Sequence, residues 1–375
     1  MSSNITLFAG SQKVEDRSSA VIMPFDSSRV LFLSQLSEAL LQGNYSAPLK
    51  ALGFWLRESQ IKAWKEEYKP NDHLLLAPIG RVFIVSPSNV EGLFAYSWSL
   101  SYLMGNQTIV RVSAAITSDQ KKLFDLFNLI DEQTNGEALN NQAFLSYDKH
   151  SDWTRKCSDW CQFRMLWGSD QSIEDIRRVT LPAQSQERVF PDRYSISVLH
   201  LEEQDIPIIS GLAESFARDV ITFQQQACAS PKWVIWYRTS KKIQTLFWDA
   251  VEKFIVGSFA KNETFMSAQY LCAFGAEVER VGGLSIVNYR EIINDGVALR
   301  GVLGQFDQSC ISEIGRAFPQ NLQSISHYGL SHESKLELSK TSQVSQFCRL
   351  GEALTFTKNW DGVDLITVFS RKVRL

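Results

Sequence analysis

The sequence predicts an α/β protein with two lobes, and three observations support this fold class. The chain has 375 residues, enough for a large hydrophobic core that divides into two parts. Short apolar runs rich in β-branched residues alternate with longer runs of helical periodicity. Strand, helix and strand also follow one another within about 30 residues, which is typical of a parallel sheet.

The first such unit runs from His73 to Ser113. RVFIVS is a short apolar run closed by Pro87, as expected of a buried strand. From Val90 to Met104 the apolar spacing predicts a largely buried helix, which Gly105 ends. TIVRV then predicts a second strand. Together these elements predict a parallel sheet.

The same alternation continues along the chain. Ser118 can cap an amphipathic helix that runs through LFDLFNLID. QFRMLW and RYSISVLHL predict strands, and GSDQSIEDIRR between them opens a helix. DIPIISGLAESFARDVITF and LFWDAVEKFIVGSF are helical, and QQQACASPKWVIWY between them reads as a turn and a strand. The last residues predict an apolar strand with a basic tip.

Composition and charge exclude several classes of protein. Hydrophobic residues make up 44% and charged residues 21%, which is ordinary for a globular protein. A net charge of -3 without a basic run argues against nucleic acid or an anionic membrane as the main partner. No apolar run reaches the roughly 18 residues of a membrane span, and the first residues do not resemble a signal peptide. We therefore expect a cytoplasmic protein.

The cysteines predict neither a disulfide framework nor a metal site. Six cysteines in a chain of this length are too few and too scattered for a disulfide scaffold. Cys157 and Cys161 would share a helix face, but no histidine or further cysteine is near enough in the sequence to complete a zinc site. We expect both to be structural thiols in a reducing compartment, and no bound metal.

Common catalytic motifs are absent. The chain has no GxGxxG dinucleotide motif, no GxxxxGK[ST] phosphate loop and no GxSxG nucleophile turn. Its five histidines show no metal-ligand spacing. Cys228 stands out because the small residues Ala227, Ala229 and Ser230 surround it, leaving room for a carbonyl beside the thiol and a backbone N–H. From spacing alone, a buried inert cysteine remains the simpler interpretation.

Resemblance to a known family changes that balance. FARDVITFQQQACASPKWVIW resembles the nucleophile segment of the LuxC-type fatty acyl reductases, which supply aldehyde to bacterial bioluminescence and belong to the aldehyde dehydrogenase superfamily. PIGRVFIVSPSNVEGL, LMGNQTIVRVS and LWGSDQSIEDIRR resemble further blocks in the right order, and RLGEALTFTKNWDGVDLITVFSR resembles the closing segment. The resemblance runs from about Pro78 to the C-terminus. It implies an aldehyde-dehydrogenase-like fold, with a mostly parallel sheet flanked by helices in each lobe.

The resemblance also implies site residues. Cys228 would carry the acyl group, and Asn89 would bind the oxyanion. Arg111 stands where a lysine commonly touches the adenosine ribose, and a cation there would welcome the 2′-phosphate of NADPH. Gly168 and Ser169 would receive the cofactor pyrophosphate at a helix start. The remaining cofactor-binding residues in these blocks are Ser86, Pro87 and Ser113.

Simpler interpretations of these residues remain open. The GSDQS helix start is also an ordinary capped surface helix, and Pro-Ser-Asn is also turn chemistry. Arg111 alone could be a surface charge. His327, in SISHYGL, is a candidate proton donor for which a structural role is equally open.

One departure from the superfamily bears on the reaction. Hydrolytic aldehyde dehydrogenases carry a general-base glutamate in a Glu-Leu-Gly-Gly context before the cysteine. The corresponding stretch from Arg188 to Leu199 has no glutamate, and Asp192 is its nearest carboxylate. An enzyme that passes an acyl thioester to hydride rather than to water needs no such base. The expected activity is therefore NADPH-dependent reduction of an activated acyl group to an aldehyde.

The alternatives are an aldehyde-oxidising dehydrogenase and a non-catalytic scaffold that handles acyl groups. We expect an acyl thioester substrate and a homo-oligomer, with an acyl-protein synthetase or acyl carrier protein as possible partners. Residues 71–186 should form the cofactor-binding lobe and residues 187–345 the catalytic lobe. Residues 346–375 should complete the fold, and residues 1–70 have no predicted role.

Overall fold

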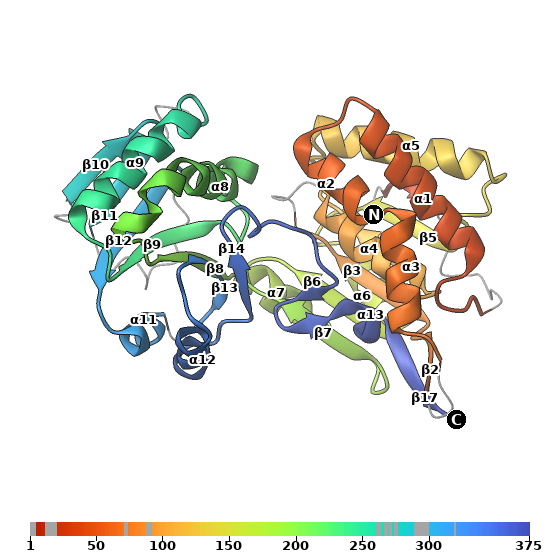
Figure 1. The fold of residues 1–375 in the computed structure, drawn as a ribbon. Helices are drawn as coiled ribbons and strands as arrows, with labels where there is room; N and C mark the ends of the chain where they lie inside the picture. Colours follow the sequence, from red (N-terminus) through yellow and green to blue (C-terminus); the bar gives the residue numbers. More distant parts are fainter. Residues whose placement is uncertain are drawn as a thin grey trace. The chain divides into compact units, whose positions relative to one another are not determined.

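The chain forms two compact units in the computed structural model. One comprises Met1–Pro191 together with Phe356–Leu375, and the other comprises Asp192–Thr355. Each contains one large, mostly parallel sheet flanked by helices (Figure 1), so the predicted fold class is confirmed. The structure describes residues 5–11, 21–70, 74–87, 92–259, 264–265, 269, 272–273, 277–288, 300–318 and 320–375.

The first unit contains a six-stranded sheet in the order β1-β5-β4-β3-β6-β7. Adjacent strands are parallel except β1, which is antiparallel to β5. The chain passes from β3 to β4 and β5 on one side and then returns to β6 and β7 on the other, so its winding direction reverses between β3 and β6. The strands are β1 (Thr6–Gly10), β3 (Arg81–Val85), β4 (Gln107–Arg111), β5 (Gln142–Ser146), β6 (Phe163–Trp167) and β7 (Gln186–Phe190).

An aromatic core holds the helices of this unit on its sheet. Every residue of α4 is buried, as its apolar pattern predicts, and Trp98 packs on Phe127 and Phe144. The first 70 residues contribute to this core, because Phe32 of α1 lies edge-on to Trp98. The helices are α1 (Ser27–Gln42), α2 (Ala47–Trp55), α3 (Glu58–Glu67), α4 (Leu93–Leu103), α5 (Ser118–Glu132), α6 (Trp153–Trp160), α7 (Asp170–Arg177) and α13 (Leu365–Val368).

The second unit contains a seven-stranded sheet in the order β10-β11-β12-β9-β8-β13-β14. Only β10, beside β11, is antiparallel among these strands. The strands are β8 (Tyr194–Leu199), β9 (Pro231–Tyr237), β10 (Glu277–Val281), β11 (Leu284–Asn288), β12 (Val302–Gln308), β13 (Leu322–Tyr328) and β14 (Gln346–Arg349).

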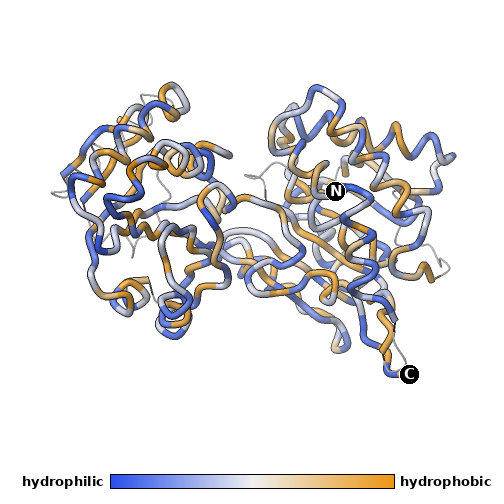
Figure 2. Tube along the Cα trace, in the orientation of Figure 1, coloured by the Kyte–Doolittle hydropathy of each residue, from blue (hydrophilic) through white to orange (hydrophobic). Residues whose placement is uncertain are grey.

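Two hydrophobic clusters form the core of the second unit. One contains Phe216 and Phe247 on two helices that contact each other, and the other contains Ile314 and Leu338. Hydrophobic stretches follow central strands such as β9, whereas hydrophobic and hydrophilic residues alternate along the helices (Figure 2). The helices are η2 (Glu203–Ile208), α8 (Ile209–Ile221), η3 (Thr222–Gln225), α9 (Lys241–Ile255), α11 (Ile311–Ala317) and α12 (His332–Thr341).

The end of the chain differs from its prediction. The apolar residues before the tip form the short helix α13, in which Leu365 and Ile366 are buried. The strand is instead the basic segment β17 (Ser370–Arg374), antiparallel to β2 (Leu74–Pro78). A half-exposed strand in a two-stranded sheet tolerates charged residues, whereas the core beside it selects the apolar ones. A second pair, β15 (Asn359–Trp360) and β16 (Val363–Asp364), precedes it.

The cap of α5 also differs by one residue. Thr117, not Ser118, is the N-cap, and its hydroxyl accepts the backbone N–H of Gln120 at 3.2 Å. The side chain of Gln120 returns a bond to the backbone N–H of Thr117 at 3.0 Å, which completes a capping box.

Candidate functional site

The predicted cofactor residues lie at the carboxyl edge of the first sheet. Ser86 follows β3 and donates its backbone N–H to the Arg111 carbonyl at 3.0 Å. Gly168 follows β6, so it and Ser86 flank the reversal in winding between β3 and β6. Open α/β sheets bind ligands at such a reversal. Pro87 follows Ser86, whereas Asn89 lies outside the described residues.

Ser169 is the N-cap of α7. Its hydroxyl accepts the backbone N–H of Ser172 at 3.3 Å and lies 2.9 Å from the Ser172 hydroxyl. The helix start is thus well formed, and its dipole favours an anion beyond it. Asp170 in the first turn already supplies one negative charge there, so a pyrophosphate would have to share this end of the helix.

Arg111 ends β4, the second parallel strand along the chain. Its guanidinium lies over the ring of buried Tyr147, 4.9 Å from the centroid. Dinucleotide-binding folds read the ribose 2′ position near the end of the second strand, where an arginine accommodates a 2′-phosphate. Ser113 lies just beyond, and its hydroxyl accepts the backbone N–H of Ala115 at 3.3 Å.

A left-handed turn leads to Cys228 in the second unit. Phe223, Gln224 and Gln225 have φ of 54°, 50° and 62°. Residues other than glycine cost about 1–2 kcal/mol each in this region, because Cβ approaches the following carbonyl. Three in succession require support from the surrounding structure.

The side chain of Gln225 provides that support. It is fully buried, and its amide nitrogen donates to the carbonyls of Pro231 at 3.0 Å and Val302 at 2.9 Å. Its amide oxygen accepts the backbone N–H of Gly301 at 2.9 Å. The ammonium of Lys232 donates to the backbone oxygen of Gln225. The turn is therefore joined to β9 and β12.

Cys228 itself lies in a tight turn just before β9. The backbone N–H of Ser230 bonds to the Ala227 carbonyl at 3.0 Å and closes this turn around the cysteine. Cys228 is partly exposed. Within the described part of the chain, the buried Ser230 hydroxyl and Gln226 side-chain nitrogen have no hydrogen-bond partner.

Two other cysteines have a different environment. Cys157 and Cys161 are buried around the end of α6, and burial raises the pKa of Cys161 to about 12. A thiol with such a pKa is not a nucleophile at neutral pH.

No group of three or more metal-binding side chains occurs among the described residues.

The structure does not bring His327 to Cys228. His327 pairs with Val198, and Val198 pairs with Ile235, so His327 is level with the fifth residue of β9. Cys228 lies before the first, which separates the two by more than about 13 Å along the strands. Burial, with Lys335 and Arg349, lowers the pKa of His327 to about 4. These positions do not support His327 as a proton donor at Cys228.

Asp192 lies at the same edge of the second sheet as Cys228. It precedes β8, whose residue Ser195 pairs with Pro231 at the start of β9. Asp192 is exposed. It remains the nearest carboxylate in sequence to the position of the missing glutamate.

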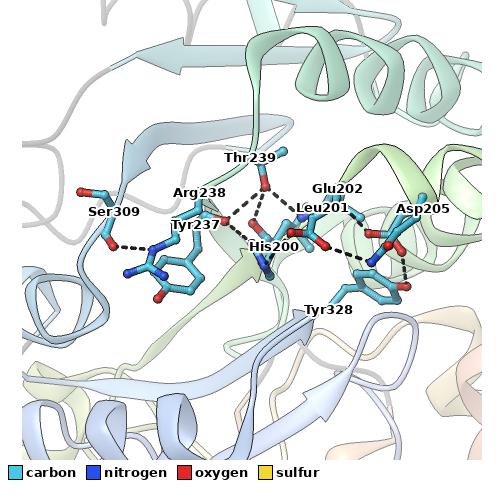
Figure 3. Close-up of polar contacts among 11 residues, drawn as sticks. His200, Leu201, Glu202, Asp205, Tyr237, Arg238, Thr239, Ser309 and Tyr328 are labelled. Carbon is cyan, nitrogen blue, oxygen red and sulfur yellow. Dashed lines mark hydrogen bonds and ion pairs between the residues drawn. The ribbon is translucent and has the colours of Figure 1, made fainter.

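Sequence reasoning missed the polar cluster at the opposite, carboxyl edge of this sheet (Figure 3). His200 Nδ1 lies 2.9 Å from the Tyr237 carbonyl, and the Tyr328 hydroxyl donates to Asp205 at 2.8 Å. The Thr239 hydroxyl accepts the backbone N–H of Leu201 at 2.9 Å. These groups bond to one another and hold the ends of β8, β9 and β13 together, which is a structural role.

Gln225 and Lys232 were also missed. Their sequence signal is weak, because a glutamine run and a lysine at a strand start are common on protein surfaces. Only the tertiary structure places the Gln225 side chain between β9 and β12.

In the described part of the chain, no helix is long and apolar enough to cross a bilayer.

These features define the fold class of the protein, and solved structures agree. It resembles aldehyde dehydrogenase 21 from Physcomitrella patens, with a TM-score of 0.71 and 12% identity over 95% of this chain and 86% of that one. It also resembles the aldehyde dehydrogenase of Mycobacterium tuberculosis, with a TM-score of 0.71 and 10% identity over 98% of this chain and 88% of that one. The indole-3-acetaldehyde dehydrogenase AldA of P. syringae is also similar, with a TM-score of 0.70 and 10% identity over 93% of this chain and 83% of that one. The protein has the aldehyde dehydrogenase fold.

The family follows from the sequence. Residues 17–271 match the model of the LuxC acyl-CoA reductases, and the chain belongs to this family. Family and fold together support an oxidoreductase that acts on acyl or aldehyde groups. No curated protein matches the chain.

Proposed function

We propose that this protein reduces an activated acyl group to an aldehyde with NADPH, through an acyl thioester on Cys228. The observation that carries the proposal is the braced turn that presents a partly exposed thiol in a chain of the LuxC family. A strained segment held by buried hydrogen bonds is a frequent property of catalytic turns.

The chain's own residues would act as follows. The Cys228 thiolate attacks the carbonyl carbon of the acyl donor, forming a carbon–sulfur bond while the donor thiol leaves. The Cys228 backbone N–H would hold the developing oxyanion, and the family resemblance assigns the same role to Asn89, which lies outside the described residues. Bound NADPH would supply the hydride. After hydride addition, the carbon–sulfur bond to Cys228 breaks, which releases the aldehyde and regenerates the thiolate.

The first sheet suits a nicotinamide dinucleotide. Ser86, Gly168 and Ser169 border the reversal in winding, where a dinucleotide pyrophosphate binds in related folds. Arg111 at the end of the second strand favours NADPH over NADH, because a guanidinium pairs well with a 2′-phosphate. In this proposal Met1–Pro191 binds the cofactor and Asp192–Thr355 carries the nucleophile.

Reduction is favoured over oxidation by the missing base. The stretch from Arg188 to Leu199 contains no glutamate to activate water, and Asp192 is the remaining carboxylate. The donor is an acyl thioester, either of CoA or of an acyl carrier protein or acyl-protein synthetase. A homo-oligomeric, cytoplasmic enzyme fits this role. The alternatives remain an aldehyde-oxidising dehydrogenase and an acyl-handling scaffold.

An NADPH oxidation assay tests the proposal. Long-chain acyl-CoA added to the protein and NADPH should cause acyl-dependent loss of NADPH absorbance and the appearance of aldehyde. Cys228→Ala should abolish both signals, whereas Cys157→Ala, with a buried thiol in the other unit, should retain them. NADPH oxidation that survives in Cys228→Ala would assign the acyl group to another residue. A silent wild type with every acyl donor would favour the scaffold.

A further inference from the structure

Lys232 closes the loop that carries Cys228. It is half-buried at the second position of β9, and its ammonium donates to the backbone oxygen of Gln225. The amide nitrogen of Gln225 bonds to Pro231, the residue before the lysine, at 3.0 Å. The segment from Gln225 to Lys232 is therefore a short loop joined at its ends by two hydrogen bonds, with Cys228 near its middle. Both bonds restrict where the ammonium can lie.

Lys232 and Cys228 belong to the same short closed loop, so the charge of one affects the ionisation of the other. Burial lowers the pKa of Lys232 to about 8, and the negative charge of Cys228 opposes that effect. A partly buried ammonium that keeps its proton at pH 7 is stabilised by a nearby anion. Among the described residues, Arg300 also brings a charge to this turn, since its guanidinium donates to the Gln224 side-chain oxygen at 3.4 Å.

The interaction is reciprocal. If the thiolate favours the protonated lysine, the protonated lysine favours the thiolate by the same free energy. Reactive cysteines in other proteins owe their thiolate form to an adjacent cation or a helix start. His327 cannot supply that cation here, because it lies at the opposite edge of the sheet and is neutral.

We propose that the Lys232 ammonium is the positioning residue that holds Cys228 as a thiolate ready for acyl transfer. This inference rests on the proposed function of Cys228 as acyl carrier. During acylation the thiolate forms its bond to the carbonyl carbon, and the donor carbon–sulfur bond breaks. The departing thiolate takes a proton from water, and Lys232 keeps its own. The lysine thus lowers the cost of forming the nucleophile without contacting the substrate.

The pH dependence of Cys228 alkylation tests this inference without any acyl substrate. Iodoacetamide is added to the intact protein over a range of pH, and the rate is followed by mass spectrometry on the peptide that contains Cys228. Lys232→Met keeps the length of the side chain but not its charge. It should raise the pH midpoint of Cys228 alkylation by about one unit. The alkylation rate at pH 7 should then fall about tenfold. Lys232→Arg should restore most of the wild-type profile.

Exposed Cys310 is the internal control, since its profile should be identical in every variant. The reciprocal variant covers the case in which Lys232→Met fails to fold: Cys228→Ser should lower the pH midpoint for acetylation of Lys232. Unchanged midpoints for Cys228 in Lys232→Met, or for Lys232 in Cys228→Ser, would overturn the inference. Failure of the proposed function is distinguishable, because it would leave these midpoint shifts intact while acyl-CoA fails to label the wild type.

Discussion

Arg111 ends β4 and Tyr147 follows the neighbouring parallel strand β5, and the guanidinium lies over the ring. This contact restricts the arginine side chain, so less entropy is lost when the guanidinium binds a phosphate. The family resemblance selected Arg111 as a cofactor-binding residue, but it did not select its aromatic partner Tyr147. A lysine at position 111 would keep the charge but lose the planar, multi-donor guanidinium.

Arg111→Ala should therefore weaken binding of NADPH more than it slows catalysis. A hydrogen bond to a charged group contributes about 1.5–3 kcal/mol, which corresponds to a roughly 10- to 100-fold increase in KM for NADPH. The KM for NADH should change little, because NADH has no 2′-phosphate. Arg81→Ala is the matched control, since Arg81 lies at the opposite end of β3 in the same sheet. Equal use of NADH and NADPH by the wild type would remove Arg111 from the cofactor site.

Among the elements, the buried strands were predictable and the left-handed turn that leads to Cys228 was not. β3, β4 and β6 are largely buried and contain the apolar runs Val82–Val85, Ile109–Val110 and Met165–Trp167, because both faces of a parallel sheet are covered, and that pattern is local. The left-handed turn at Phe223–Gln225 contains no glycine to signal it. Its stability comes from hydrogen bonds of Gln225 to Gly301 and Val302, 76 and 77 residues further along the chain. Tertiary contacts of this kind override local preference.

Helix α8, which leads to that turn, carries a buried carboxyl group with an unusual pKa. Asp219 accepts the backbone N–H groups of Gly351 at 2.7 Å and Ala353 at 3.1 Å, and so holds the segment where the chain leaves the second unit. Burial raises its pKa to about 7, although those two N–H groups, with Arg218, lower it and Glu352 raises it.

The sign of the resulting pH dependence follows from proton binding. Between pH 4 and 7 the folded protein holds a proton on Asp219 that the unfolded chain loses near the ordinary aspartate pKa of 3.8. Asp219 therefore lowers the free energy of unfolding as pH rises, by at most about 1.4 kcal/mol per pH unit. His327 acts in the opposite direction, because its lowered pKa makes the unfolded state bind more protons. Only a comparison with an Asp219 variant separates the two.

Asp219→Asn should be less stable than the wild type at pH 5, because an amide group presents one donor to the two backbone N–H groups. The difference should shrink as the pH rises to 7.5. Urea unfolding of both proteins at the two pH values measures it. A difference that stays constant would show that Asp219 does not hold a proton in the folded protein.

At the scale of the whole molecule, the aldehyde dehydrogenase fold is shared with proteins at 10–12% identity, so the fold alone does not define the reaction. In the proposed function, the residues around Cys228 define the reaction. The pattern of strands and helices predicted two lobes, but it could not show that the last residues, Phe356–Leu375, return to the first unit. That return depends on tertiary packing, as in the burial of Leu365 and Ile366.

The central claim is that Cys228 forms an acyl thioester that passes to hydride rather than to water. The most direct measurement incubates the protein with acyl-CoA and no NADPH, and follows the mass of the Cys228 peptide. One acyl group should appear on that peptide and persist for minutes, because a positioned base typically accelerates such hydrolysis about 10²–10⁴-fold and none is placed between Arg188 and Leu199 beyond Asp192. Added thiols should release the acyl group faster than water does. Labelling of a different cysteine, or rapid thiol-independent release of free acid, would contradict the account.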